Sequence, residues 1–151
     1  MSRVKHTEKF EIGQPVGRLF PLFSAEGETL WVPGWTYENV MGTEELHEDY
    51  VFLTRAHDHS STEAVWIVKR HEPEEYLVQF YKVEAGDKVG VVSVQCFEEG
   101  EVATRIEVSY EYIGLSEQGD AFVGGFTAEA YRQFIAEWKR LLENYFLRGA
   151  C

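Results

Sequence analysis

Hydrophobic and polar residues alternate along most of the chain, a pattern that is typical of β-strands. In residues 4–12 the inward-facing positions are expected to be Val4, His6, Glu8, Phe10 and Ile12. Further strands, rich in β-branched and aromatic residues, are predicted near residues 36–42, 50–57, 63–71, 75–84, 88–97 and 101–113. The connections between these later strands are short, so consecutive strands are expected to pair as antiparallel hairpins.

Two hairpins can be registered from their glycine turns. If residues 98–100 form a three-residue loop with Gly100 in the left-handed conformation, Cys96 lies opposite Val102. The inner face of this hairpin then carries Gly90, Val92, Val94, Cys96, Val102, Thr104, Ile106, Val108, Tyr110 and Tyr112. The same reasoning at Gly86 places further residues inward, namely Tyr76, Val78 and Phe80.

Helical patterns occur at two places. Two short helical segments are predicted between the first and second strands, at residues 16–20 and within residues 24–35. The longest helix is predicted after Gly124-Gly125, with Ser116 or Thr127 as its capping residue. Its apolar stripe recurs at three- and four-residue spacing and consists of Ala130, Phe134, Trp138, Leu141, Leu142 and Tyr145.

A sheet with one apolar face needs a cover, and the C-terminal helix is the only predicted element long enough to provide it. We therefore predict an α+β fold, in which a seven-stranded curved antiparallel sheet wraps around the long C-terminal helix. The two short helices connect strands 1 and 2. With 151 residues, the chain has the length of a single domain, spanning residues 1–151.

The charge balance restricts the candidate partners. Lys and Arg number 14 and Asp and Glu number 26, which gives a net charge of −12. Nucleic acid and anionic membrane surfaces are therefore poor partners, and no apolar run is long enough for membrane insertion. The two cysteines, Cys96 and Cys151, and the absence of a signal-peptide pattern lead us to expect a cytoplasmic protein.

Several segments, taken in order, match a known pattern. They are PVGRLF at 15–20, GETLWVPGW at 27–35, VSYEY at 108–112, LSEQG at 115–119 and WKRLLENY at 138–145. With the order of elements, they make the chain resemble the START-like (SRPBCC) superfamily, which includes polyketide cyclase/dehydrase and lipid-transport proteins. The resemblance covers essentially the whole chain and implies the helix-grip fold.

The resemblance also implies a deep cavity between the sheet and the long helix, which holds an apolar or aromatic small molecule. Polyketide cyclase/dehydrase-like activity is a further implication, although the resemblance transfers no catalytic residue. Aromatic residues make up 15% of the chain, and they either fill the core or line such a cavity. The expected ligand-binding residues are Trp31, Trp35, Trp66, Phe80, Val92, Val94, Ile106, Val108, Tyr110, Phe134, Trp138, Leu141 and Tyr145.

A second interpretation belongs to another functional class. The chain also resembles the chaperone-activator branch of the same superfamily, which would make it a protein-interaction module that binds a partner through its acidic outer surface. A filled core favours this interpretation, and an aromatic-lined cavity favours the first. We expect no cofactor, and a homodimer is compatible with either interpretation.

His6 and Glu8 are the candidates for proton transfer. They are two residues apart on the inner side of the first strand, so their side chains project in the same direction. A carboxylate and an imidazole at an apolar cavity are suited to acid–base chemistry. The alternative is that this end of the strand lies at the rim of the sheet, where both side chains contact water.

Three other groups of residues have two interpretations each. His57, Asp58 and His59, with Glu63 nearby, have metal-ligand chemistry, but a polar turn explains them better, and we predict no metal site. Trp31 and Trp35 either form one lip of the cavity or anchor the short helices to the sheet, and Glu26 and Glu28 are either paired carboxylates or solvent-exposed helix positions.

Overall fold

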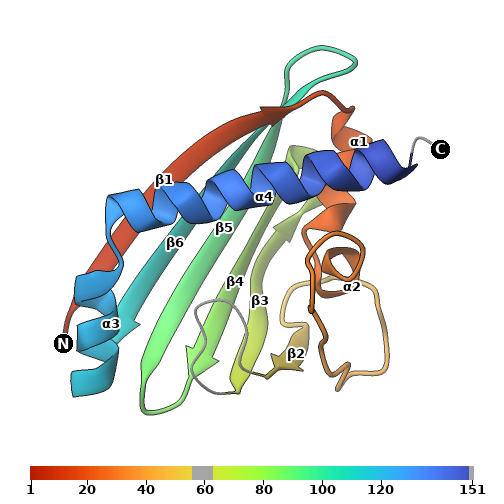
Figure 1. Ribbon diagram of the computed structural model, residues 1–151. Coiled ribbons are helices and arrows are strands. Elements are labelled where there is room, and N and C mark those ends of the chain that lie inside the picture. Colours follow the sequence, from red (N-terminus) through yellow and green to blue (C-terminus); the bar gives the residue numbers. More distant parts are fainter. Residues whose placement is uncertain (56–62, 150–151) are drawn as a thin grey trace.

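The computed structural model describes residues 1–55 and 63–149 (Figure 1). One antiparallel sheet contains six strands in the order β1-β6-β5-β4-β3-β2. Their bounds are β1 Arg3–Ile12, β2 Val51–Thr54, β3 Ala64–Glu72, β4 Leu77–Glu84, β5 Lys88–Glu98 and β6 Thr104–Gly114. The helices are α1 Val16–Leu19, η1 Phe20–Leu22, α2 Ala25–Glu28, η2 Pro73–Glu75, α3 Glu117–Gly125 and α4 Ala128–Gly149.

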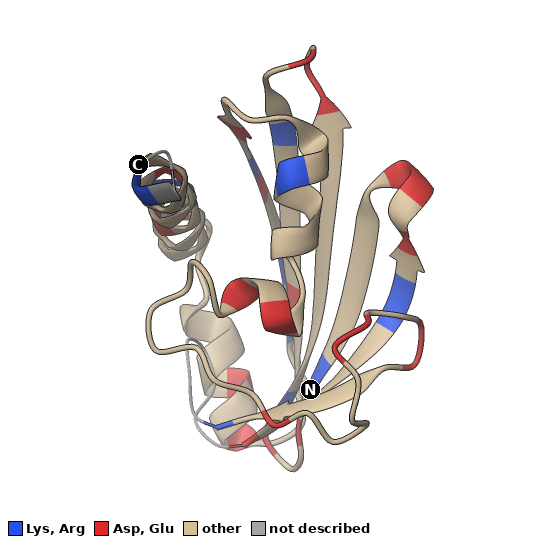
Figure 2. Cartoon of the chain, turned by 90° about the vertical axis from the view of Figure 1, so that its right-hand side faces the viewer, with Lys and Arg blue, Asp and Glu red and all other residues tan. Residues whose placement is uncertain are grey.

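Helix α4 lies across one face of the sheet, which we call the inner face, and the segment from α1 to α2 closes the same side (Figure 1). Acidic residues mark hairpin tips, loops and helix α2 (Figure 2). Within the described residues, no helix combines the length and the hydropathy that crossing a bilayer requires. The predicted α+β architecture, with two short helices after the first strand and a long final helix, is confirmed.

The predicted strand at residues 36–42 is wrong, so the sheet has six strands instead of seven. This segment makes only one isolated bridge, between Glu38 and Leu53. The chain there is held by a side chain instead, because the single Tyr50 O–H is shared between the Asn39 side-chain oxygen at 2.9 Å and the Thr43 carbonyl oxygen at 2.8 Å. These hydrogen bonds replace the ladder that a seventh strand would have formed.

The predicted register of the β5–β6 hairpin is wrong by four residues, since Cys96 lies opposite Ile106 and not opposite Val102. The connecting loop is longer than three residues and closes with a hydrogen bond from the Glu99 amide to the Ala103 carbonyl at 2.9 Å. Val102 lies in this loop and is 72% exposed. A shift by an even number of residues keeps the same side chains inward, and the remaining inner positions of the hairpin are therefore buried as expected.

Both expected caps are used, because the C-terminal part contains two helices. The Ser116 hydroxyl accepts the Gly119 amide at the start of α3, and the Thr127 hydroxyl accepts the Ala130 amide at the start of α4. Ala130 is exposed, so its place in the predicted stripe is wrong. The buried stripe of α4 consists of Tyr131, Ile135, Trp138 and Leu142. Phe134, Leu141 and Tyr145 lie half-buried beside it.

Gly100 has a φ of +97°, as the turn predicted, and a Cβ there would meet no atom within 4 Å. Only backbone strain therefore opposes a side chain at this position. We expect Gly100→Val to lower the free energy of unfolding by about 1–2 kcal/mol, measured by urea denaturation. The matched control is Gly13→Val, because Gly13 also has open space but its φ is outside the left-handed region, so its loss should be clearly smaller. Equal losses at the two positions would contradict this explanation.

Candidate functional site

A cavity of about 20 Å³ lies between the sheet, α4 and the segment that carries α2. Its walls are mostly aromatic, with one carboxylate, and consist of Phe23, Glu28, Phe52, Trp66, Phe80, Val92, Val94, Tyr110 and Trp138. A cavity of this size accommodates about one water-sized group. The deep cavity that the family resemblance implied is therefore almost closed in this conformation, because the aromatic side chains occupy most of the space.

Two groups of aromatic rings form these walls. The Trp138 indole from α4 stacks on Phe23 at 6.0 Å and meets Tyr110 edge-on at 6.3 Å between ring centroids. On the other side, the Trp66 ring stacks on Phe52 at 5.5 Å and meets Phe80 edge-on at 5.9 Å. Stacked and edge-on contacts of this kind are the favourable geometries for aromatic pairs, so both walls are well packed.

Trp31 and Trp35 hold the α2 segment together. The Trp31 indole N–H donates to the Leu22 carbonyl at 2.9 Å, and the Trp35 indole N–H donates to the Ala25 carbonyl at 2.8 Å. Gly27 is packed so closely that a Cβ there would overlap the Pro21 carbonyl oxygen. Neither tryptophan lines the cavity. Of the two interpretations of Trp31 and Trp35, the structure therefore favours anchoring of the short helices over a lip of the cavity.

The two carboxylates of α2 lie in different environments and do not form a pair. Ala25 is buried, and Glu28, three residues later on the same side of the helix, lines the cavity. Glu26 accepts a hydrogen bond from the Tyr37 hydroxyl at 2.6 Å. Burial and this hydrogen bond raise the pKa of the Tyr37 hydroxyl above its ordinary value.

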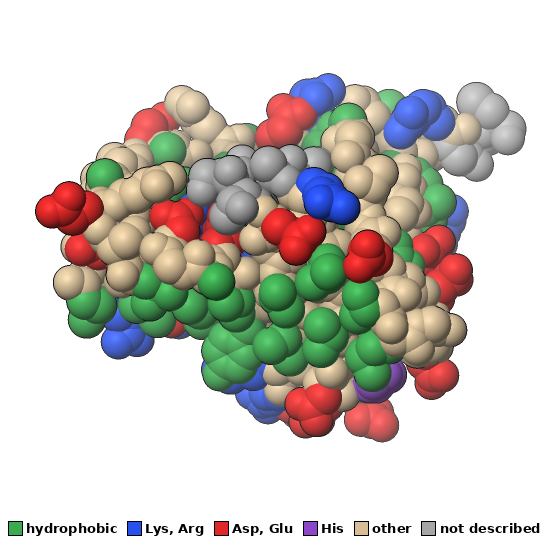
Figure 3. All heavy atoms as spheres, turned by 90° about the horizontal axis from the view of Figure 1, so that it is seen from below, with side chains coloured by type: hydrophobic (Ala, Val, Ile, Leu, Met, Phe, Trp, Pro, Cys, Tyr) green, Lys and Arg blue, Asp and Glu red, His purple; other side chains and the backbone are tan. Residues whose placement is uncertain are grey.

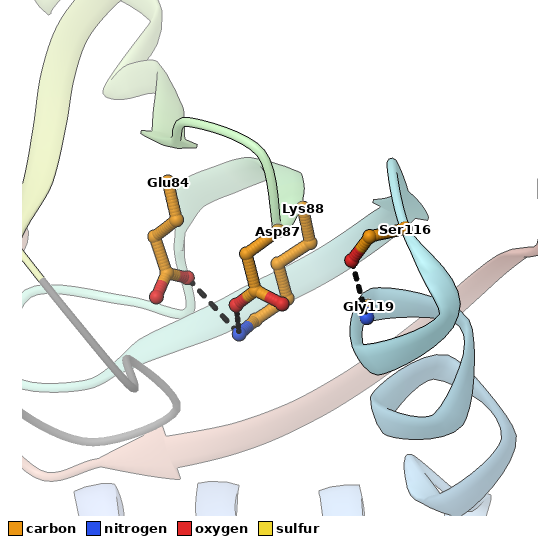
Figure 4. A network of polar contacts seen from close by, with 5 residues as sticks. All are labelled: Glu84, Asp87, Lys88, Ser116 and Gly119. Carbon is orange, nitrogen blue, oxygen red and sulfur yellow. Dashed lines mark hydrogen bonds and ion pairs between the residues drawn. The ribbon is translucent and has the colours of Figure 1, made fainter.

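A buried ionic cluster lies at one end of the inner face (Figure 4). The Lys88 Nζ is 3.2 Å from the Glu84 Oε2 and 3.0 Å from the Asp87 Oδ2, and the Lys88 side chain is only 2% exposed. The ammonium group also lies 4.2 Å from the centre of the Phe122 ring of α3. Burying these charges is tolerated because an opposite charge and an aromatic face surround the ammonium group.

A second buried lysine, Lys82, lies beside the aromatic cavity. The Lys82 Nζ lies 5.3 Å from the centre of the Trp66 ring, and Lys82 is 2% exposed. The Trp66 indole N–H donates to the Thr54 hydroxyl at 2.9 Å. Sequence reasoning missed these buried charges. The signal was the alternation along β4, in which Lys82 and Glu84 continue the inward positions of Val78 and Phe80.

His6 and Glu8 do not line the aromatic cavity. A ring nitrogen of His6 lies 2.8 Å from the Phe126 carbonyl, and its ring packs against Phe126 and Tyr131. The Tyr131 hydroxyl donates to the Val108 carbonyl, and burial, followed by the charge of Glu8, raises the pKa of Tyr131. His6 therefore lies at the junction of β1 with α3 and α4, where its contacts fasten the helices to the sheet, and Glu8 is close enough for its charge to act on Tyr131.

The structure places the expected lining residues in three environments. Trp66, Phe80, Val92, Val94, Tyr110 and Trp138 line the cavity. Trp31, Trp35, Ile106 and Val108 lie in the surrounding core, and Phe134, Leu141 and Tyr145 lie half-buried along α4. Sequence reasoning did not include three lining residues, Phe23, Glu28 and Phe52.

The histidine-rich segment His57-Asp58-His59 lies outside the described residues. Its neighbour Glu63 is ion-paired with Arg55 at 3.4 Å. Within residues 1–55 and 63–149, no group of three or more His, Cys, Asp or Glu side chains is arranged to hold a metal ion.

No protein-family model and no curated protein matches this sequence. Solved structures do match. Norcoclaurine synthase from Thalictrum flavum, in complex with dopamine and hydroxybenzaldehyde, is 12% identical with a TM-score of 0.67, over 93% of this chain and 87% of that chain. The major latex-like protein 151 of Panax ginseng is 18% identical with a TM-score of 0.71, over 95% and 97%. Ara h 8.0201 is 16% identical with a TM-score of 0.70, over 97% and 99%.

These likenesses extend over nearly all of this chain and of each matched chain, so they show a shared fold. The helix-grip fold that the family resemblance implied is confirmed. Identities between 12% and 18% carry the fold alone, so function has to be argued from the residues of the site.

The ionic cluster yields a stability prediction. Lys88→Met leaves the carboxylates of Glu84 and Asp87 buried without the ammonium group that lies between them, and we expect a loss of about 3–5 kcal/mol in the free energy of unfolding. Lys69→Met is the matched control, because Lys69 is an exposed lysine of the same sheet whose ammonium group lies 5.2 Å from the centre of the Tyr81 ring, and its loss should stay below about 1 kcal/mol. Urea denaturation compares the two variants, and similar losses would show that the cluster contributes nothing.

Proposed function

We propose that this protein binds a small aromatic molecule that carries a positively charged or hydrogen-bond-donating group. The observation that carries the proposal is the combination of aromatic rings with the Glu28 carboxylate around one cavity. Aromatic walls accept flat apolar rings, and their faces attract cations. A single carboxylate in such a lining fixes the orientation of a ligand through its polar end.

Binding an aromatic ring requires the cavity of about 20 Å³ to open. The segment from η1 to Trp35 is the wall best suited to move. It contributes Phe23 and Glu28 to the cavity, while the indole hydrogen bonds of Trp31 and Trp35 both end within the segment itself. The segment could thus shift as one body without losing these two hydrogen bonds, and the ring contacts of Trp31 with Trp138 and of Trp35 with Trp66 are what the shift would change.

One structural neighbour supports the ligand class. Norcoclaurine synthase, which has the same fold, holds dopamine and hydroxybenzaldehyde in its structure, and dopamine is an aromatic amine. A cyclase- or dehydrase-like reaction in the cavity of the present protein would require proton transfer. Glu28 and the Tyr110 hydroxyl are the lining groups suited to it among the described residues.

The second interpretation, a protein-interaction module, is favoured by the small size of the cavity. The two functions differ in a simple observable, since only the first requires a small molecule between the sheet and α4. Probe binding therefore distinguishes them.

The test compares 2-phenylethylamine with 2-phenylethanol, which differ mainly in the charge of the terminal group. Trp66 and Trp138 line the cavity, so binding is followed by their fluorescence. We expect the amine to bind at least about 10-fold more tightly than the alcohol, and Glu28→Gln to abolish most of this preference, because the amide carries no charge.

Glu26→Gln is the matched control, since Glu26 belongs to the same helix but is hydrogen-bonded to Tyr37 outside the cavity. This variant should keep the preference for the amine. Equal affinity for both probes, or a preference that survives in Glu28→Gln, would contradict the assigned ligand class. If neither probe binds, the small-molecule function is wrong and the interaction module is favoured.

A further inference from the structure

A second and much larger space, a cleft of about 580 Å³, lies where η1 and α2 face the loop at residues 42–49 and the end of β3. We call it the acidic cleft. It shares no lining residue with the aromatic cavity, so the α2 segment contributes to two separate spaces. Leu30 is 53% exposed at its edge. The apolar side chains of its lining are Phe20, Pro21, Leu30, Leu46 and Pro73.

Contacts with β3 and its end hold the acidic cleft in shape. The Phe20 ring stacks on His71 at 6.0 Å between ring centroids, and both residues line the cleft. The loop at residues 42–49 is fixed to β3, because the Asp49 amide donates to the Val68 carbonyl at 2.9 Å. Docking in this cleft therefore requires no opening, in contrast to the aromatic cavity of about 20 Å³.

Three carboxylates line the acidic cleft, from Glu26 of α2 and from Glu44 and Glu45 of the loop. Burial, followed by the charges of Glu26 and Glu44, raises the pKa of the Tyr50 hydroxyl, so carboxylates from two separate segments act on the same place. Among the described residues, no Lys or Arg lines the cleft, and no ion pair involves any of the three carboxylates. The negative charge of the cleft is thus not offset by basic side chains of this part of the chain.

The histidine of the lining does not offset the charge at neutral pH either. Burial of its ring, followed by the neighbouring His47, lowers the pKa of His71, so its imidazole is uncharged at pH 7. Glu74 and Glu75 follow the lining residue Pro73 and are exposed. Figure 2 looks onto this side of the molecule, with acidic residues on α2 and on the loops around the cleft. Seen from below, acidic side chains also lie along the same edge, at the right of Figure 3.

The combination of apolar side chains and uncompensated carboxylates indicates the chemistry of the occupant. Without an occupant, the carboxylates repel one another and the apolar side chains contact water, and a segment with both basic and apolar side chains removes both costs. A small-molecule site encloses most of its ligand, whereas this cleft has exposed apolar side chains at its edge, such as Leu30. Its shape therefore favours a peptide that lies along it over an enclosed small molecule.

We propose that the acidic cleft docks a peptide segment of a partner protein in which arginine or lysine residues flank apolar side chains. The apolar side chains of the peptide pack against Leu30 and Leu46, and its basic side chains lie beside Glu26, Glu44 and Glu45. The apolar contact provides most of the affinity, and the charges select and orient the peptide. This docking site is independent of the proposed small-molecule function, because it uses none of the residues that line the aromatic cavity.

The test titrates three fluorescein-labelled hexapeptides, RRLLRR, RRGGRR and EELLEE, with the full chain and follows their fluorescence anisotropy at about 0.15 M salt. We expect RRLLRR to bind with a Kd below about 100 µM, and RRGGRR to bind at least about 10-fold more weakly because it lacks the apolar side chains. EELLEE should show no binding, because its charges repel those of the cleft. Equal affinity for the two arginine peptides would reveal only a general attraction to an acidic chain and would overturn the proposal, as would the absence of RRLLRR binding.

Two variants locate the binding in the acidic cleft. The double variant Glu44→Gln/Glu45→Gln should weaken RRLLRR binding at least about 10-fold, because it removes two of the three charges of the lining. Leu30→Ser should reduce the preference for RRLLRR over RRGGRR at least about 3-fold, because it shortens the apolar wall.

Glu98→Gln/Glu101→Gln is the matched control, because it changes the net charge equally at two exposed residues beside the β5–β6 turn. Its RRLLRR affinity should change by less than about 3-fold, and equal losses in the two double variants would contradict docking in the cleft. Circular dichroism verifies that all variants fold. Sedimentation velocity tests a different occupant, since self-association of the parent chain that RRLLRR disrupts would assign the cleft to a second copy and overturn the proposal.

Discussion

The inner face of this sheet changes from aromatic to ionic along the strands, and each part requires a different cover. Trp66 and Phe80 belong to the aromatic part, which α4 covers with Trp138. Lys88 and its carboxylates belong to the ionic part, where Phe122 of α3 lies against the ammonium group. A single straight helix could not serve both parts, and the break between α3 and α4 follows from this division.

The period-two alternation predicted the inner and outer sides of the strands better than it predicted their pairing. Moving the β5–β6 register by four residues left Val92 and Tyr110 inward, because an even shift preserves the face. The length of the β5–β6 loop did not follow from its glycine, because Gly100 has a left-handed conformation in the longer observed loop as well as in the predicted three-residue loop. The alternation therefore determined the inner face of the sheet but not the register of its strands.

The site was less predictable because it combines residues from separate elements. Trp66 and Trp138 could be chosen from apolar periodicity, but Glu28 lies on a helix of one turn, too short for a periodic pattern. Lys82 and Glu84 occupy inward positions of β4, where an apolar residue is the normal expectation. Glu84 pairs with Lys88 of the same hairpin, but the aromatic rings beside Lys82 and Lys88 come from β3 and α3, and a single-sequence pattern does not contain these contacts.

The proposed ligand site uses only one side of β4 and β5. Phe80 and Val92 line the cavity, whereas Tyr81 and Val91 point to the other side of the same strands. A wall for ligand binding must keep its shape, and the hydrogen-bonded ladders of these central strands hold it in place. The α2 segment, on the far side of the cavity, is not part of the sheet and is therefore the part of the wall that moves when a ligand enters.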